Sequence, residues 1–97
     1  MARAYVISDV AFRDRAALER YRTLAAASMA RHGGRYLVRG GPVEALEGSW
    51  QPAALIVVEF PDRQAAQAWY RSPDYAEALA FRDAALSRDL ILAEGVG

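Results

Sequence analysis

Two pairs of glycines, Gly33-Gly34 and Gly40-Gly41, enclose a short run of residues, and this feature most limits how the chain can fold. Glycine adopts backbone angles that other residues avoid. The first pair can therefore end a helix, and the second can bend a strand or admit another backbone. We predict a strand at Arg35–Arg39, between the two pairs. One βα unit precedes this strand and a second follows it.

The segments around the glycines predict the order strand, helix, strand, strand, helix, strand. Ala4–Phe12 is rich in β-branched and aromatic residues, which favours a strand. Asp14 is a suitable N-cap for a helix that runs through Arg31. The residues that share the apolar face of this helix at helical spacing are Leu18, Tyr21, Ala25, Ser28 and Met29.

The second half is expected to hold a strand, a helix in two pieces and a final strand. The expected segments are Ala54–Phe60 (strand), a helix from Asp62 that restarts at Ser72-Pro73-Asp74 and runs to about Ser87, and Leu90–Glu94 (strand). Pro42–Gln51 is either a second short strand or an ordered loop. Simple alternation within Arg35–Arg39 places Arg35, Leu37 and Arg39 on one side and Tyr36 and Val38 on the other.

This order predicts one α+β domain over residues 1–97, with a ferredoxin-like βαββαβ fold. Its four-stranded antiparallel sheet would carry both helices on one face. Ala54–Val58 is apolar on both sides, although no third helix is available to cover the second face. A second copy of the chain, packed sheet against sheet, would cover it. A sheet curled enough to hide its own back face is the alternative.

Composition removes several classes of function. Twelve basic and twelve acidic residues cancel, which disfavours nucleic acid and anionic membranes as partners. Every basic residue is arginine, so chemistry that needs a lysine amine is excluded. With no cysteine and one histidine, we expect no metal and no cofactor. No apolar run reaches the length of a membrane span, and the chain is expected to be cytoplasmic.

A set of short motifs spread over nearly the whole chain resembles the DUF1330 family of small bacterial proteins, in the dimeric α/β-barrel superfamily. The matching residues are Tyr21, Gly33-Gly34-Arg35-Tyr36, Arg39-Gly40-Gly41, Glu47-Gly48, Trp50, Glu59-Phe60, Ala68-Trp69-Tyr70, Ser72-Pro73-Asp74-Tyr75, Arg82 and Glu94-Gly95. The chain departs from the family at Ala53-Ala54, where relatives often have a basic residue. The resemblance implies a homodimer with facing sheets and a cavity between sheet and helices. It implies no particular reaction.

His32 is the candidate for proton transfer, because histidine alone has an ordinary pKa near neutrality. At the end of a helix it can equally serve as a surface or capping residue.

Arg39, beside a glycine pair, is a candidate for binding a substrate carboxylate with its fork of donors. The alternative is an ion pair with Glu47, Glu59 or Asp9. Antiparallel pairing of the two central strands would bring Arg35, rather than Arg39, close to Glu59.

The remaining candidate binding residues are Glu47, Trp50, Ser72, Tyr75 and Arg82. Glu47 and Arg82 are charges in apolar surroundings, and a buried arginine needs either a carboxylate such as Glu47 or Asp9 or a bound anion. Trp50 and Tyr75 could line a pocket mouth. Ser72 fits a helix cap better than a nucleophile, because no G-x-S-x-G turn surrounds it.

Three functions are open from the sequence. The first is binding of a small anionic or aromatic molecule between sheet and helices. The second is a cofactor-independent enzyme that uses His32 and Arg39, and the resemblance to the superfamily suggests a monooxygenase-like or isomerase-like reaction for it. The third is a non-catalytic structural dimer. Whether the chain is an enzyme is not decided by its sequence.

Overall fold

Strands and helices follow one another in the predicted order, with the second helix in two pieces. The computed structural model describes residues 2–96. Its elements are β1 (Ala4–Phe12), α1 (Arg15–Arg31), β2 (Arg35–Arg39), β3 (Leu55–Phe60), α2 (Arg63–Tyr70), α3 (Pro73–Ala85) and β4 (Leu86–Glu94).

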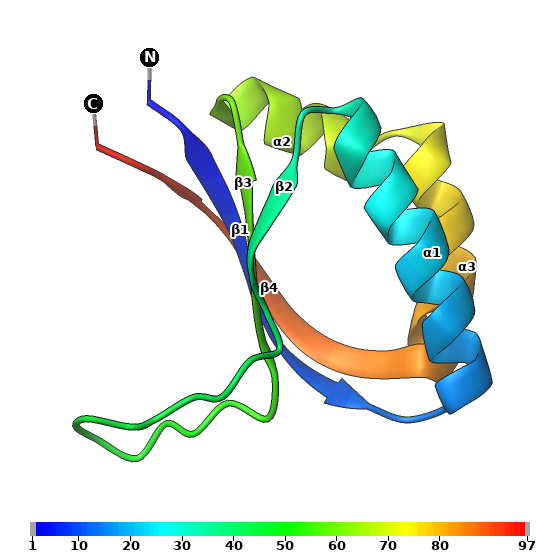
Figure 1. The fold of residues 1–97 in the computed structure, drawn as a ribbon. Helices are drawn as coiled ribbons and strands as arrows, with labels where there is room; N and C mark the ends of the chain where they lie inside the picture. The colour runs from blue at the N-terminus through cyan, green and yellow to red at the C-terminus, as the bar shows by residue number, and fades with distance from the viewer. Residues whose placement is uncertain (1, 97) are drawn as a thin grey trace.

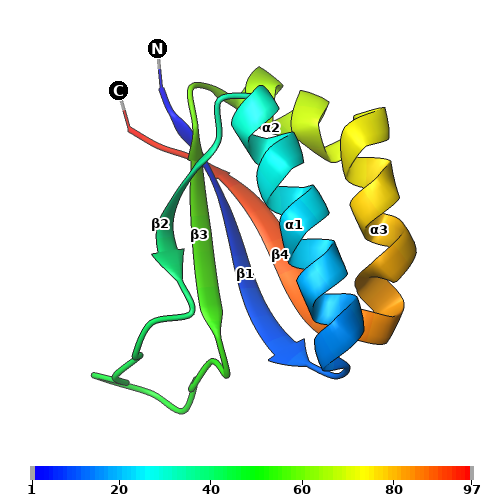
Figure 2. The same ribbon diagram turned by 45° about the vertical axis from the view of Figure 1, so that its right-hand side comes forward.

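The four strands form one antiparallel sheet in the order β2-β3-β1-β4. All helices lie against one face of this sheet, with α1 and α3 side by side and α2 at the end near the chain termini (Figures 1 and 2). The predicted ferredoxin-like α+β fold is confirmed. The opposite face carries no helix, as Figure 1 shows.

Short polar side chains start the three helices, as the sequence predicts. The side chains of Asp14, Asp62 and Ser72 each accept a hydrogen bond from a backbone N–H three residues further on. Such bonds satisfy donors that the first helical turn leaves free. Asp74 adds a negative charge to the first turn of α3, where the helix dipole favours it.

The core lies between the sheet and the helices. The buried face of α1 consists of Leu18, Tyr21, Ala25, Ser28 and Met29, which are the residues of the predicted stripe. They face every second residue of β1, Ala4, Val6, Ser8 and Val10, which are also buried. Trp69 and Tyr75 are fully buried and fill the space between the helices and the sheet.

β4 is longer than the sequence predicts. It begins at Leu86 rather than Leu90, directly after α3 ends at Ala85. The reason is pairing: β4 runs antiparallel to the whole of β1, so that Leu86 lies opposite Phe12 and Arg88 opposite Val10. The extra strand residues turn Leu86, Arg88 and Leu90 towards the helices.

β2 contains a β-bulge, so its side chains do not alternate between the two faces of the sheet as predicted. Pairing with β3 shifts register between Tyr36 and Val38, so Tyr36 lies opposite Val58 and Arg39 opposite Ile56. Val58 and Ile56 face the helices, and the extra residue therefore brings Arg39 to the same face as Tyr36. Simple alternation placed these two residues on opposite faces.

The segment between β2 and β3 is a loop without regular structure, which settles the alternative left open for Pro42–Gln51. Gly40 starts it with a positive φ of 74°, a conformation that glycine adopts readily. In Figure 1 the loop projects from the side of the sheet away from the helices.

Candidate functional site

A small cavity of about 50 Å³ lies between the sheet and the helices. Most of its wall is apolar, and the space suffices for a few water molecules, at roughly 10–15 Å³ each. The lining residues are Val6, Ser8, Val10, Phe12, Leu18, Tyr21, Arg22, Ala25, Met29, Tyr36, Arg39, Gly40, Ile56, Val58, Trp69, Leu86, Arg88 and Leu90. Phe12, Arg22, Arg39 and Gly40 are exposed, so the cavity opens to solvent at their end.

Three arginines line this cavity, and no acidic residue of the described chain lines it with them. Arg22 lies over the ring of Phe12 at 5.2 Å, and Arg39 over the ring of Tyr36 at 4.3 Å. Neither of them, nor Arg88, forms an ion pair with a carboxylate within residues 2–96. The cavity therefore has an excess of positive charge.

Arg88 has two buried phenols as its partners. Its Nη1 donates to the hydroxyl of Tyr21 and its Nη2 to the hydroxyl of Tyr75, while the two hydroxyl oxygens are 2.7 Å apart and hydrogen-bonded to each other. The guanidinium also lies near the faces of both rings, at 5.4 Å from that of Tyr21 and 5.9 Å from that of Tyr75. Three elements meet here: β4, α1 and α3.

The ionisation of these groups follows from burial. Burial raises the pKa of the Tyr21 hydroxyl well above its ordinary value of 10.0, so this phenol stays neutral. Burial alone would lower the pKa of Arg88, but the two phenol oxygens outweigh it and the pKa is raised. The cluster thus keeps its full positive charge at neutral pH.

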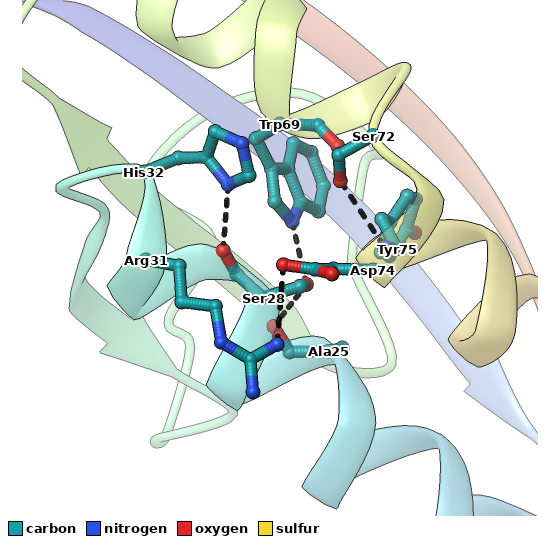
Figure 3. A network of polar contacts seen from close by, with 8 residues as sticks. All are labelled: Ala25, Ser28, Arg31, His32, Trp69, Ser72, Asp74 and Tyr75. Carbon is teal, nitrogen blue, oxygen red and sulfur yellow. Dashed lines mark hydrogen bonds and ion pairs between the residues drawn. The ribbon is translucent and has the colours of Figure 1, made fainter.

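His32 lies outside this cluster. It follows the last turn of α1, where its Nδ1 is 2.9 Å from the carbonyl oxygen of Ser28 (Figure 3). Arg39 is at the far end of β2, beyond five strand residues that span roughly 13 Å. The structure therefore does not bring the two residues of the enzyme alternative together.

Ser72 and Tyr75 hold the start of α3 in place. The Oγ of Ser72 accepts from the N–H of Tyr75 and donates to the carbonyl of Trp69 (Figure 3). Ser72 is used as a cap, as expected. The ring of Tyr75 packs against Trp69, with centroids 4.2 Å apart, so Tyr75 lies in the core and not at a pocket mouth.

Glu47, Trp50 and Arg82 are not among the residues that line the cavity. Glu47 and Trp50 lie in the exposed loop after β2, and the indole of Trp50 donates to Asp9. Arg82 pairs with its neighbour Asp83 at 3.3 Å, so neither Glu47 nor Asp9 is its partner.

Glu59 pairs with Arg35, as antiparallel pairing predicts, and with Arg3. Both arginines donate to Oε1 of Glu59 at 2.9 Å. Burial alone would raise the pKa of this carboxyl, but the two arginines outweigh it and hold the pKa below its ordinary value of 4.5. Arg39 is thus free of the ion pair with Glu59 that the sequence left open.

Arg88 and Arg22 were not among the site residues predicted from the sequence. The signal for Arg88 is the two-residue spacing of Leu86, Arg88 and Leu90, which is typical of a strand facing a core. It was missed because the helix was expected to run to about Ser87 and the next strand to begin only at Leu90, which left Arg88 outside both elements. Arg22 shows no comparable signal, because it lies beside the buried stripe of α1.

Residues 2–96 contain neither a cluster of metal ligands nor a helix suited to span a membrane. No three histidine, cysteine, aspartate or glutamate side chains of this part of the chain lie close enough together to hold a metal ion. None of its helices has the length and apolarity needed to cross a membrane.

Known proteins share both the sequence pattern and the fold. The model of the domain of unknown function DUF1330 matches residues 3–96. No curated protein matches the chain. Two crystal structures of RPA0582, one of them methylated, share 22% sequence identity with the chain and have a TM-score of 0.78. Each match covers 99% of this chain; it covers 82% of the methylated RPA0582 chain and 84% of the other. The second structure is described as a protein of unknown function from Rhodopseudomonas palustris.

A third structure is that of SnoaB, a cofactor-independent oxygenase from Streptomyces nogalater. Its TM-score is 0.69 at 14% identity, and the match covers 100% of this chain and 96% of SnoaB. At these identities the likeness establishes the fold and not the reaction.

Proposed function

Because this chain belongs to the DUF1330 family, whose description assigns no activity, we propose a function from its own side chains: it binds a small organic anion in the cavity between sheet and helices. The observation that carries this proposal is the lining of Arg22, Arg39 and Arg88 without an acidic partner in the described chain. Arg88 is the partly buried one of the three, and its partners Tyr21 and Tyr75 are neutral, so a bound anion would supply the opposite charge that it lacks.

The apolar wall supports an organic rather than an inorganic anion. Val10, Leu18, Met29 and Val58 line the same space as the arginines. A ligand with an apolar body and an anionic group would match both parts of the wall. Since the cavity is small, the body of such a ligand would extend towards the open end between Phe12 and Arg39.

Binding is favoured over catalysis by what the wall contains. No aspartate, glutamate or histidine of residues 2–96 lines the cavity, and a general base must reach the proton that it removes. The enzyme alternative depended on His32, which lies at the other end of β2 from Arg39.

A thermal-shift screen of small aromatic anions tests this function. We expect some of them to raise the melting temperature of the wild-type protein, and Arg88→Gln to abolish the rise. Arg63→Gln, which changes an exposed arginine at the start of α2, is the matched control and should retain it. A rise of equal size in Arg88→Gln would contradict the proposal.

We also propose that the chain forms a homodimer through the uncovered face of its sheet. Ile7, Val57 and Ile91 form one cross-strand row on this face, and Ile91 is 59% exposed. The loop after β2 projects on this side of the sheet (Figure 1), and its exposed Trp50 donates to Asp9, which lies on the same face of β1 as Ile7. Leu46 in this loop is also exposed. A second copy would bury this apolar surface with an identical one.

Sedimentation equilibrium measures the oligomeric state directly. We expect a mass of twice the 10.6 kDa of one chain at micromolar concentration. Ile91→Arg, which places a charge in the proposed contact, should return the monomer mass. A wild-type protein that stays monomeric would contradict the dimer and leave the anion site untouched.

A further inference from the structure

We infer that the hydroxyl of Tyr21 and the guanidinium of Arg88 form a donor pair for a single anionic oxygen, of the phenolate or enolate kind, and that Tyr75 positions both of them. This inference rests on the proposed anion-binding function and names the chemical class that the cavity selects.

The first step is the number of hydroxyl hydrogens in the cluster. Tyr21 and Tyr75 together have two, and only one of them can lie in the 2.7 Å bond between their oxygens. Both bonds to Arg88 take their hydrogens from the guanidinium, because arginine has donors and no acceptor. One phenolic hydrogen therefore has no acceptor within residues 2–96.

The second step assigns that hydrogen to Tyr21. The side chain of Tyr75 is fully buried, packs against the rings of Trp69 and Tyr70, and does not line the cavity. Tyr21 does line it. If Tyr75 donates to Tyr21, the hydroxyl of Tyr21 keeps its own hydrogen for an acceptor in the cavity. The reverse arrangement would leave a donor among packed aromatic rings, which is unfavourable.

The third step concerns the guanidinium of Arg88. Arginine holds a carboxylate with two parallel N–H bonds, one to each oxygen. In this protein Nη1 of Arg88 donates to the Tyr21 oxygen and Nη2 donates to the Tyr75 oxygen. The two phenol oxygens therefore lie where the two oxygens of a carboxylate would otherwise bind. The N–H groups that remain are of two kinds. Nε–H and the outer N–H of Nη2 form a second parallel pair on the Tyr75 side, whereas the outer N–H of Nη1, the nitrogen that bonds to Tyr21, has no parallel partner and can serve one oxygen only.

A ligand atom that meets Tyr21 and Arg88 together is therefore one oxygen, and the positive charge favours its ionised form. Burial raises the pKa of the Tyr21 hydroxyl, which keeps that group a donor while the ligand is ionised. Ionised phenols and enols supply such an oxygen on an apolar body. At the pair formed by Tyr21 and Nη1 of Arg88, a carboxylate would bind with one oxygen only.

The test compares 4-nitrophenol with 4-nitrobenzoate, which have the same ring and differ in the anionic group. We expect the full-length protein to bind 4-nitrophenolate at least about tenfold more tightly than 4-nitrobenzoate. Near the pKa of free 4-nitrophenol, binding should raise the absorbance of its ionised form. Tyr21→Phe should weaken nitrophenolate binding about tenfold or more, which is the usual loss for a hydrogen bond to a charged group.

Two variants distinguish positioning from simple packing. Tyr75→Phe frees one Nη of Arg88, so we expect the preference for 4-nitrophenolate over 4-nitrobenzoate to shrink or reverse. If Tyr75 had only a structural role, Tyr75→Phe would weaken the binding of both compounds by the same factor. Tyr70→Phe, a tyrosine on α2 that does not line the cavity, is the control and should leave both affinities unchanged.

The outcomes separate the two proposals. If the wild-type protein binds neither compound, both fail. If it binds 4-nitrobenzoate as tightly as 4-nitrophenolate, or if folded Tyr21→Phe keeps full nitrophenolate affinity, the donor pair is overturned and anion binding stands. The comparison of the two compounds uses wild-type protein, so it decides the matter even if a variant does not fold.

Discussion

The indole Nε1 of Trp69 donates a hydrogen bond of 3.0 Å to the Oγ of Ser28, and this bond joins α2 to α1 inside the core (Figure 3). The same Oγ donates to the carbonyl of Ala25 at 2.7 Å, and Ser28 is fully buried. One small hydroxyl therefore satisfies the indole N–H of the largest core side chain.

We predict that Ser28→Ala lowers the free energy of unfolding by about 1–3 kcal/mol, because it leaves the Trp69 N–H buried without an acceptor. Urea unfolding followed by tryptophan fluorescence measures this change in the free energy of unfolding. Thr23→Ala on the same helix, where an exposed hydroxyl bonds to the carbonyl of Glu19, should change stability much less. Equal losses in the two variants would show that the indole bond is not the cause.

Gly34 makes room for the ring of Phe60. A Cβ on Gly34 would lie 2.8 Å from Cε1 of Phe60 and 3.1 Å from the carbonyl oxygen of Met29. We predict that Gly34→Ala destabilises the fold by about 1–3 kcal/mol, the usual range for overpacking. Gly41→Ala, where a Cβ meets nothing within 4 Å, is the matched control in the same thermal unfolding experiment. A Gly34→Ala protein as stable as that control would contradict the close approach.

The raised pKa of Tyr21 predicts loss of stability in alkali. Above its ordinary value of 10.0, the unfolded chain releases this proton while the folded chain still holds it. The unfolded state is thereby favoured, and the free energy of unfolding falls as pH rises beyond that value. Tyr21→Phe should flatten this part of the pH profile of denaturant unfolding. A wild-type profile that is level between pH about 10 and about 11.5 would contradict the raised pKa.

The lowered pKa of Glu59 predicts a loss of stability in acid. Above its ordinary value of 4.5 this carboxyl is ionised in both states, and the bonds from Arg3 and Arg35 stabilise the folded chain. As pH falls below that value, the unfolded chain takes up the proton first and the stabilisation is lost. We expect Glu59→Gln to be less stable than wild type at neutral pH. The difference in the free energy of unfolding between wild type and Glu59→Gln should narrow as pH falls below 4. A difference that stays constant would contradict the lowered pKa of Glu59.

Local signals in the sequence predicted most of the fold. Asp14, Asp62 and Ser72 cap helices because a cap depends on neighbours only three residues away, and the buried stripe of α1 depends only on helical spacing. The order of the elements then favoured the ferredoxin-like sheet, in which β1 pairs with both β3 and β4.

The positions of the site residues depend on how strands far apart in the sequence pair with one another. Local sequence signals carry no information on this pairing. The bulge after Tyr36 brings Arg39 to the helix-facing side, and the register of β4 on β1 turns Arg88 inward. Both effects arise from hydrogen bonds to residues far away in the sequence. Arg82, six positions before Arg88, was therefore the expected buried arginine, although it pairs with Asp83 at the surface end of α3.

The central claim is that the cavity lined by Tyr21, Arg39 and Arg88 holds an organic anion. A crystal soaked with 4-bromo-2-nitrophenol, which is ionised near neutral pH, tests it by the anomalous scattering of bromine. We predict a bromine peak at the cavity or its open end by Phe12 and Arg39, with the phenolate oxygen towards Tyr21 and Arg88. Bromine found only in the more open depression between α2 and β4, or nowhere on the protein, would contradict the claim.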